Sequence, residues 1–458
     1  MNDGRKKDAS FDLFLTIAAC LWMGAFPLLQ GGTYARITRD KWYIMVFLSG
    51  ITLLCLLADL FREGRREKNA FGAVLCRRFL NKQTQLPLLL GCILLGWMLV
   101  CCLCGPYGAE TWLIGASVRR EGWLTQVCYI GLMMCFIGSG VREKPVVMAA
   151  AGGVVVFFVI VMLQRFGGNP LNLYPRGTSY ALNPEFQGTI GNIDMDNGYL
   201  CIMAALFLFS GLKYGRKKTA GESGKRADKR ILVISATLGF VLCCWMILTM
   251  NVQFGIMTLT VLLAAAGIGF LPNKRRIQVL VLLTVLVCLL IWFWPGTEEG
   301  ALWELHELVH GRGRLSFGSN RLGVWKYSLK LAEERPFLGG GTDTFVYRFN
   351  IYLEEHGLSL PTEQNGVPLQ VYFDNPHNEY IAQLVNHGLP GTLLFIGLIL
   401  TALRREKKGN APLLTACSAS VFGYALQAFF SFSVCMTAPM FWVMAGMSAG
   451  GTKGEGLL

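Results

Sequence analysis

The chain has five histidines, at positions 306, 310, 356, 377 and 387, and all of them lie between Trp294 and Leu393. Chance would have spread them along the chain. His377 stands in the segment 373–391, F-D-N-P-H-N-E-Y-I-A-Q-L-V-N-H-G-L-P-G, just before an apolar run that starts near Leu393. Histidine is the side chain best suited to moving protons near neutral pH. The segment therefore predicts a site in which His377 moves a proton.

Two shorter motifs suggest metal chemistry instead. Residues 306–310 (H-E-L-V-H) match H-E-x-x-H, which on a helix binds zinc with Glu as the base, and Glu333 or Glu334 could supply a third ligand. The motif is interleaved with leucines, as in an amphipathic interfacial turn, so a zinc metallopeptidase that uses His306, Glu307 and His310 is the weaker hypothesis. Residues 194–196 (D-M-D) resemble the D-x-D of metal-dependent glycosyltransferases, but a two-letter motif at a helix start favours capping.

The composition is that of a membrane protein. Of the 458 residues 53% are apolar and 16% charged, whereas soluble domains have about 25% charged residues. Most of the 15 cysteines lie inside apolar runs and none lies in 295–388, so they are interpreted as small apolar packing residues and not as a disulfide framework.

Twelve apolar runs predict an all-α polytopic membrane protein with about 12 transmembrane helices. No small-residue cleavage pattern follows the first run, so it is interpreted as an uncleaved helix. The predicted division is 1–294 with helices one to nine, 295–388 as one long loop with short helices, and 389–458 with helices ten to twelve. The runs are about 11–29, 42–61, 86–104, 123–140, 145–163, 197–212, 231–250, 255–271, 277–294, 391–403, 412–431 and 433–449.

The orientation follows from the basic residues between the runs. With the N-terminus in the cytoplasm, 28 of the 42 Lys and Arg residues lie in cytoplasmic segments, seven in short outer loops and seven in 295–388. Both termini are therefore predicted in the cytoplasm of a cytoplasmic (inner) membrane protein, and the net charge of +13 is explained by topology. No nucleic-acid partner is expected.

The loop 295–388 is then extracytoplasmic, and it is acidic, with twelve Asp and Glu residues against seven Lys and Arg. Residues 321–335 predict a short surface helix that Pro336 ends, and 339–341 (G-G-G) predict a flexible turn. The apolar runs contain almost no ionisable residues, which argues against a transporter of a lipid or glycan, because such a protein would place charge inside the membrane. The polar residues gather at the outer helix ends, which favours surface chemistry on a lipid-linked substrate.

At this point the chain resembles the O-antigen ligase and O-antigen polymerase family, over about residues 110–400. The most specific part is the block 376–380 (P-H-N-E-Y) followed by Gly388 and Gly391. Further matching positions are Arg321, Trp325, the segment 336–339 (P-F-L-G), Phe345, the segment 120–122 (R-E-G) and the segment 188–192 (G-T-I-G-N).

The resemblance implies a GT-C-like membrane glycosyltransferase, inverting and independent of metal or cofactor, that serves surface polysaccharide assembly. It would take a glycan from an undecaprenyl diphosphate carrier and pass it to an acceptor hydroxyl outside the cell. The acceptor is a lipid, a growing glycan or a wall polymer. The resemblance fits a ligase and a polymerase equally. Membrane lipids are the remaining partner.

The implied catalytic residues are His377 and Arg321. Arg321 fits because a guanidinium offers paired donors that match a departing diphosphate. His377 would either take the proton of the acceptor hydroxyl or hydrogen-bond a phosphate. The substrate-binding candidates are Arg119, Arg120, Arg176, Asn192, Asn378, Glu379, Tyr380 and Trp325.

Each candidate has a simpler alternative. Arg119 and Arg120 could lie at the headgroup level and Arg321 could anchor its helix. Asn192 and Asn378 could cap helices. Trp325 and Tyr380 could be interfacial aromatic residues rather than sugar-stacking platforms.

One segment departs from the family pattern. The family often has Ser-Arg-Gly between the seventh and eighth helices, but residues 251–255 here are N-V-Q-F-G. Either Arg119, Arg120 or Arg176 replaces the missing arginine, or the activity is altered.

Two expectations concern the local backbone. The helix that starts at about Asn378 is predicted to point free N–H groups toward His377, which would favour an anion and lower the pKa of the imidazole. His387, ten residues further on, is predicted to lie deeper and to be replaceable by Asn or Glu.

Overall fold

The computed structural model describes residues 11–216, 223–294, 296, 299–360, 363–364, 367–368, 372–403 and 412–449. The fold is all-α, as predicted. The strands of the described residues form two minimal antiparallel hairpins: β1 (Phe186–Gln187) pairs with β2 (Gly191–Asn192), and β3 (Glu363–Gln364) pairs with β4 (Val367–Pro368).

Each of the twelve predicted apolar runs contains a helix. Among the described residues, seven helical stretches are long and apolar enough to cross a membrane, in α2, α4, α7, α8, α9, α11 and α15. The helices of the bundle are α1 (Leu13–Cys20), α2 (Ile37–Glu67), α4 (Gln85–Leu103), α6 (Trp123–Phe136), α7 (Glu143–Arg165), α8 (Ile193–Arg216), α9 (Ser223–Met250), α10 (Gln253–Ile268), α11 (Asn273–Trp292), α15 (Glu379–Leu403), α16 (Pro412–Gln427) and α17 (Ala438–Ala449).

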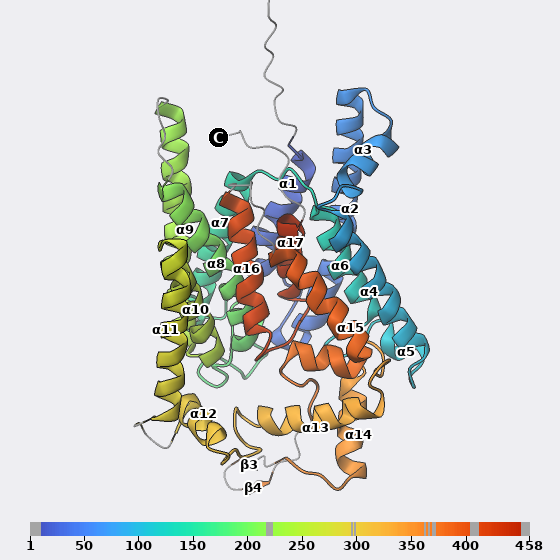
Figure 1. Cartoon of the computed structure of the whole chain (residues 1–458), viewed down its shortest axis with the longest axis vertical. Helices are drawn as coiled ribbons and strands as arrows, with labels where there is room; N and C mark the ends of the chain where they lie inside the picture. The colour runs from blue at the N-terminus through green and yellow to red at the C-terminus, as the bar shows by residue number, and fades with distance from the viewer. Residues whose placement is uncertain are drawn as a thin grey trace, which may run out of the picture.

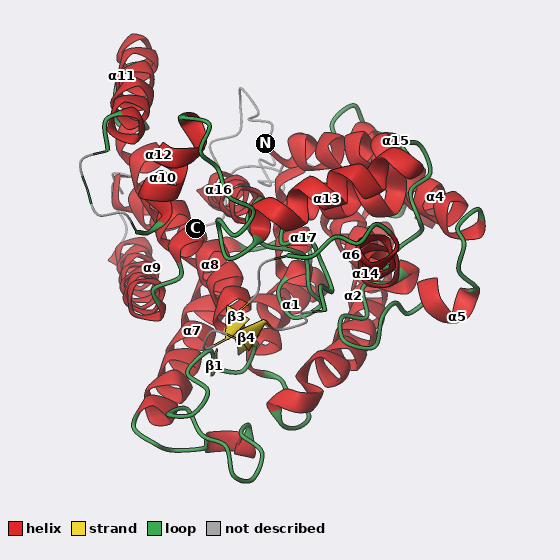
Figure 2. Ribbon diagram, turned by 90° about the horizontal axis from the view of Figure 1, so that it is seen from below, coloured by secondary structure: helices red, strands yellow, loops and turns green. Residues whose placement is uncertain are grey.

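The bundle is built around α8, which packs against α9 and α16 and is buried along most of its length. By contrast, the apolar window of α11 has no buried residue, and Figure 2 shows this helix standing at the periphery. The apolar surface that α11 exposes is what a lipid-facing helix requires.

The short helices of the predicted long loop cover one end of the bundle. They are α12 (Ala301–Val309), α13 (Arg321–Glu334) and α14 (Phe345–Glu355). Figure 1 shows α13 lying across the lower end of the bundle, with α14 beside it, so the predicted helix at 321–335 is confirmed. A small separate core joins this layer to α15, because Val324, Phe349 and Val385 are buried together.

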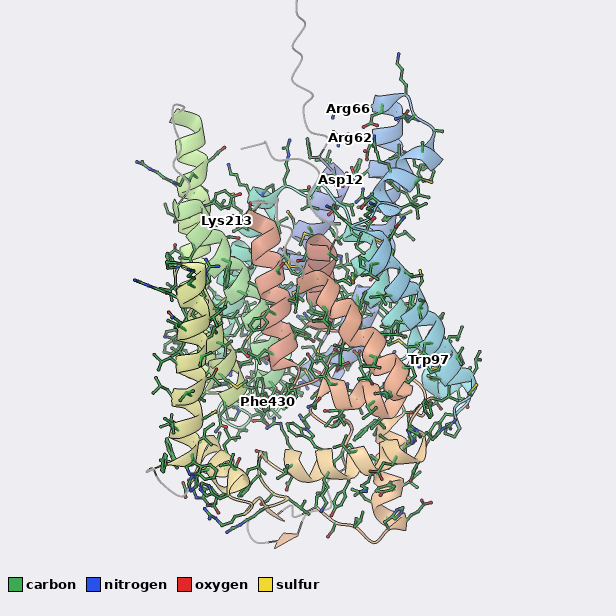
Figure 3. The ribbon with its side chains drawn as sticks, in the orientation of Figure 1. Asp12, Arg62, Arg66, Trp97, Lys213 and Phe430 are labelled. Atoms are coloured by element: carbon green, nitrogen blue, oxygen red, sulfur yellow. The ribbon has the colours of Figure 1, made fainter. Side chains whose placement is uncertain are left out.

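The opposite end carries the long basic extension of α2 and the helix α3 (Phe71–Phe79), which the sequence analysis missed. Figure 3 shows Arg62, Arg66 and Lys213 at this end, and Trp97 and Phe430 toward the other. Arg78 of α3 is buried and makes an ion pair with Asp12 over 3.1 Å between Nη1 and Oδ2. This pair ties α3 to the start of α1, which lies at the same end (Figure 1).

The start of α15 agrees with the helix start predicted at about Asn378. The helix begins at Glu379 and continues through a kink at Gly388 into the apolar run predicted from about 391. The sequence analysis did not join the two segments, because Gly388 and Pro390 together are typical of a helix break. Gly388 has a positive φ of 66°, and a Cβ there would lie 2.0 Å from the carbonyl oxygen of Phe337.

The kink explains the glycine run at 339–341, which was predicted to be a flexible turn. The N–H of Gly340 donates to the carbonyl oxygen of Val385 over 3.1 Å, and that of Gly341 donates to Asn386 over 2.9 Å. A Cβ on Gly339 would lie 2.4 Å from the backbone of Asn386. The turn is thus packed tightly against the kink and not flexible, because the kink frees carbonyl groups that its N–H groups satisfy.

Candidate functional site

His377 lies in the turn just before α15 and has a positive φ of 48°. Its backbone N–H donates to Oδ1 of Asn375 over 2.8 Å, and the carbonyl oxygen of Pro376 accepts the indole N–H of Trp325 over 2.8 Å. These two bonds fix the turn. The imidazole Nδ1 is buried and has no hydrogen-bond partner among the described residues, so the turn presents a nitrogen that can still accept or donate a proton.

The pKa of His377 is lowered to about 4. Burial is the largest cause, and the positive charges of Arg321 and Arg119 lower the pKa further, against a smaller opposing effect of Asp374. The predicted direction is therefore confirmed, and His377 is neutral at physiological pH. The predicted cause is different, as the next paragraph shows.

The first amide groups of α15 are already engaged. The N–H of Glu379 donates to the carbonyl oxygen of Ala428 over 2.9 Å. Those of Tyr380 and Ile381 both donate to Oδ1 of Asn378 over 3.0 Å. The expectation of free amides that face His377 was wrong, because Asn378 caps the helix with its own side chain.

Arg119 lies close to His377 although it is 258 positions earlier in the chain. Its guanidinium carbon lies 4.4 Å from the ring centroid of Phe432, and the His377 ring meets the same phenyl ring edge-on at 5.2 Å. Nη2 of Arg119 donates to the carbonyl oxygen of Ser433 over 3.2 Å, while Nη1 is buried without a hydrogen-bond partner among the described residues. Both groups flanking Phe432 therefore keep an unused nitrogen.

Asp343 holds Arg119 in place. Its Oδ1 lies 3.5 Å from Nε of Arg119, and its Oδ2 accepts the N–H groups of Ala116 over 2.8 Å and Glu121 over 3.1 Å. Burial raises the pKa of Asp343 to about 6, against the opposing effects of Arg119 and these backbone bonds. Burial alone would lower the pKa of Arg119, but Asp343, Asp374 and other nearby carboxyl groups raise it.

Glu121 and Glu379 complete the carboxyl groups around Arg119. The phenol of Tyr129 donates to Oε1 of Glu121 over 2.8 Å, and burial raises the pKa of Glu121 well above its ordinary value. Glu379 is buried, and its Oε2 accepts the N–H of Ser433 over 2.7 Å. Glu379 therefore binds the backbone of the loop that carries Phe432.

Arg321 begins α13 and is the second cationic group near His377. Its Nη2 lies 3.9 Å from Oδ2 of Asp194, and its Nη1 donates to the carbonyl oxygen of Gly318 over 3.2 Å. Nε is buried without a hydrogen-bond partner among the described residues. Burial lowers the pKa of Arg321, with Asp194 opposing, but a guanidinium stays charged in proteins.

Arg321 also lies beside the turn that lacks the expected arginine. Its guanidinium carbon is 6.0 Å from the ring centroid of Phe254, which belongs to the segment 251–255. Of the arginines proposed as the replacement, Arg119 lies over Phe432 and Arg120 over Trp42 and Tyr43 instead. The arginine that the structure brings to this turn is therefore Arg321.

Two further arginine candidates lie apart from the cluster. Arg120 has a positive φ of 56° and places its guanidinium over the rings of Trp42 at 5.4 Å and Tyr43 at 5.5 Å. Arg176 is exposed in the loop before β1. The structure thus joins Arg119 to His377, while Arg120 faces α2.

The remaining candidates have structural contacts. Asn192 Oδ1 accepts the N–H of Asp194 over 2.7 Å, as a helix cap does. The hydroxyl of Tyr380 donates to the carbonyl oxygen of Ala425 over 2.7 Å. Trp325 packs against Phe429 with ring centroids 5.6 Å apart, so its observed role is to support the turn at Pro376.

The H-E-x-x-H motif lies on α12, but its side chains are engaged elsewhere. His306 Nδ1 bonds the carbonyl oxygen of Ile291 over 2.9 Å, and His310 Nδ1 bonds that of His306 over 2.8 Å. Glu307 is held by Arg312 through both carboxylate oxygens. In the part of the chain that the structure describes, no group of three or more His, Cys, Asp or Glu side chains could hold a metal ion.

Sequence analysis missed three residues of this arrangement. Phe432 and Ser433 lie at the junction of the apolar runs 412–431 and 433–449, where nothing marks them, and Asp343 simply follows the glycine run at 339–341. Only the positive φ of Asp343, at 56°, shows its special backbone. Their importance depends on contacts across more than 200 positions, which spacing along one chain cannot reveal.

The structure thus defines an all-α protein with helices apolar enough to cross a membrane, in which arginines and a histidine gather at one end of the helices. Residues 238–396 match the family model described as O-antigen ligase, which confirms the family that the sequence predicted. No curated protein matches the chain. The matched region includes Arg321 and His377 and ends seven residues before α15 does; Arg119 lies outside it. The family supports a membrane enzyme that transfers glycans.

Proposed function

We propose that this protein transfers or polymerises a glycan from an undecaprenyl diphosphate carrier to an acceptor hydroxyl at the outer face of the cytoplasmic membrane. The observation that supports this most directly is the pair Arg119 and Arg321 around neutral His377. Each of the three side chains keeps a buried nitrogen that has no hydrogen-bond partner in the described part of the chain. Two guanidinium groups match the charge of a departing diphosphate, and a neutral imidazole matches a hydroxyl that must lose a proton.

The reaction breaks the bond between the anomeric carbon of the glycan and a diphosphate oxygen. Electrons of that bond leave with the diphosphate, whose growing negative charge Arg321 and Arg119 stabilise. The acceptor oxygen attacks the anomeric carbon from the opposite side, so the configuration inverts. Nδ1 of His377 accepts the hydroxyl proton; its low pKa makes it a weak base before the attack, and the developing phosphate charge beside it favours its protonation during the step.

This proposal needs no metal, because the arginines supply the charge that a cation would otherwise provide. Under this proposal, residues 1–294 and 389–458 form the membrane part, with about 12 spans in a GT-C-like arrangement. Residues 295–388 form the extracytoplasmic loop. Both termini are placed in the cytoplasm. The basic end with Arg62, Arg66 and Lys213 supports that orientation (Figure 3), since cytoplasmic loops carry an excess of Lys and Arg.

The test is transfer by the purified protein in vesicles. A synthetic glycan on undecaprenyl diphosphate is the donor, the same glycan on undecaprenyl monophosphate is the matched control, and product is followed by gel mobility. We expect transfer from the diphosphate donor only, unchanged by EDTA. Equal use of both donors would contradict the diphosphate site, and activity that EDTA abolishes and zinc restores would contradict the metal-free mechanism.

A further inference from the structure

The loop between α16 and α17 meets two other elements at one residue, Ser433. Its N–H donates to Oε2 of Glu379 over 2.7 Å, and its carbonyl oxygen accepts Nη2 of Arg119 over 3.2 Å. Glu379 belongs to α15, and Arg119 belongs to the segment before α6. Both backbone groups of Ser433 are therefore used to connect the start of α15 with the guanidinium of Arg119.

The residue before it, Phe432, separates the two reactive groups. Its ring lies under the Arg119 guanidinium carbon at 4.4 Å and meets the His377 ring at 5.2 Å, nearly perpendicular to it. A cation over an aromatic face is attracted by the ring quadrupole. The ring thus sets the distance between Nη1 of Arg119 and Nδ1 of His377, the two nitrogens without protein partners.

The carboxylate of Glu379 is itself held by a chain of hydrogen bonds within and beside α15. Nε2 of Gln383 donates to its Oε1 over 2.8 Å. Oε1 of Gln383 can only accept, so Nδ1 of His387 is the donor in their 2.8 Å contact. Nε2 of His387 then accepts the hydroxyl of Thr342 over 3.2 Å. This chain of bonds leaves the Glu379 carboxylate one orientation, the one that binds Ser433.

We propose that Phe432 and Glu379 are positioning residues of the transfer reaction, which fix Arg119 against His377. The inference rests on the proposed function and refines it. Glu379 acts on Ser433 and not on the substrate, because both of its oxygens already accept protein hydrogen bonds. Arg119 is consequently the group through which both residues affect the rate.

A double-mutant cycle tests this dependence. Arg119→Ala should lower the rate by roughly a hundredfold, as the loss of a charge-stabilising donor does. Phe432→Ala should lower it by roughly tenfold in the wild type, since a partly buried cation–π contact is lost. In the Arg119→Ala background the same change should cost less than about twofold, because residues that act through one group are not additive.

Glu379→Ala should follow the same pattern, whereas Glu379→Gln should keep most of the rate, because its amide oxygen can still accept the N–H of Ser433. Phe432→Tyr should also keep it, because the ring remains. Phe422→Ala is the matched control, since this phenylalanine of α16 is 39% exposed on the bundle surface. It should leave the rate unchanged in both backgrounds.

The outcomes separate the two proposals. Arg119→Lys serves as the background if Arg119→Ala has no measurable rate, and Phe432→Leu, which fills the volume without the ring, replaces Phe432→Ala if that variant does not accumulate. The positioning role would be overturned if the Phe432 and Glu379 variants lowered the rate by the same factor with and without Arg119, or did not lower it at all. In that case transfer by the wild type would still uphold the proposed function. A wild type that transfers no glycan would overturn both.

Discussion

His377 and His387 stand ten residues apart at the start of α15, and their surroundings are opposite. His387 is 1% exposed, and both of its ring nitrogens bond protein groups, Gln383 and Thr342. His377 is also largely buried, but its Nδ1 has no hydrogen-bond partner among the described residues. One histidine is satisfied by the fold, and the other has an unfilled hydrogen-bonding position.

This difference distinguishes a histidine with a structural role from one that is available for chemistry. A buried polar group without a partner costs about 1–3 kcal/mol, so its persistence in a fold points to a group that arrives from outside. His387 shows how the same residue type becomes part of the frame. Its carbonyl oxygen also accepts the indole N–H of Trp97 over 2.9 Å, which ties the kink of α15 to α4.

The strongest test of the comparison replaces each histidine in turn. His377→Ala should lower transfer by about a thousandfold, the loss expected of a general base, while protein level and membrane insertion persist, because Nδ1 of the side chain has no hydrogen-bond partner among the described residues. His387→Ala should instead lower thermal stability, by about 2 kcal/mol or more, because Oε1 of Gln383 and the hydroxyl of Thr342 each lose a buried hydrogen bond. Its loss of transfer should be much smaller than that of His377→Ala, because His387 acts on the site through Gln383 and Glu379.

Transfer per folded molecule and the melting temperature measure the two effects separately. His387→Glu should be worse than His387→Ala because it buries a charge, so the earlier expectation of free replacement at this position gives way to a structural role. His306→Ala is the control for a generic histidine effect and should be mild. Near-normal transfer by His377→Ala would show that His377 has no role in the reaction.

A second, smaller effect concerns the charges of α13. Arg321→Ala should cost roughly a hundredfold in transfer, because a guanidinium placed at the leaving group is lost. Arg321→Lys should rescue poorly, since an ammonium offers a point charge and no paired donors. Lys330 is the matched control on the same helix, because it is exposed and pairs with exposed Glu333 over 3.0 Å.

The transfer rates of these three variants with the diphosphate donor show whether Arg321 takes part in the reaction. Lys330→Ala should stay within about twofold of the wild type, as exposed ion pairs contribute little. Equal and small losses in Arg321→Ala and Lys330→Ala would mean that α13 only anchors the loop to the membrane surface.

The smallest effect is a pH dependence set by Asp343. With a pKa of about 6, Asp343 takes up a proton as the pH falls from 7 to 5 and loses its charge opposite Arg119. His377, with a pKa of about 4, stays neutral over that interval. Transfer should therefore fall severalfold between pH 7 and pH 5 with a midpoint near 6. The rate falls toward low pH, and not toward high pH, because the ionised form of Asp343 is the one that holds Arg119.

Asp343→Asn isolates this effect, since its amide oxygen can still accept the N–H groups of Ala116 and Glu121. Its rate at pH 7 should be lower than that of the wild type and flat between pH 7 and pH 5. A wild-type profile without a midpoint near 6, or an Asn variant that keeps it, would assign the acid limb to another group, such as Glu121 beside the same arginine, whose pKa burial raises.

The sequence by itself determined the class of protein, because twelve apolar runs and few charges allow only helices in a membrane. It also determined the helix at 321–335 and directed attention to residues 376–380, since capping, periodicity and the family motif are local patterns. It predicted roles for Arg321 and His377 from the family motif together with residue type, because few side chains can stabilise a diphosphate or accept a proton at neutral pH.

Only the tertiary structure decided which residues meet. It selected Arg119 over Arg120 and Arg176, assigned Trp325, Asn378 and Tyr380 to supporting contacts, and added Phe432, Ser433 and Asp343. It turned the glycine run at 339–341 from a flexible turn into a tight contact with the α15 kink. The physical reason is common to all of these. Burial, unused hydrogen-bonding positions and ion pairs depend on distances between segments far apart in the chain, and helix periodicity fixes only which residues of one segment share a face.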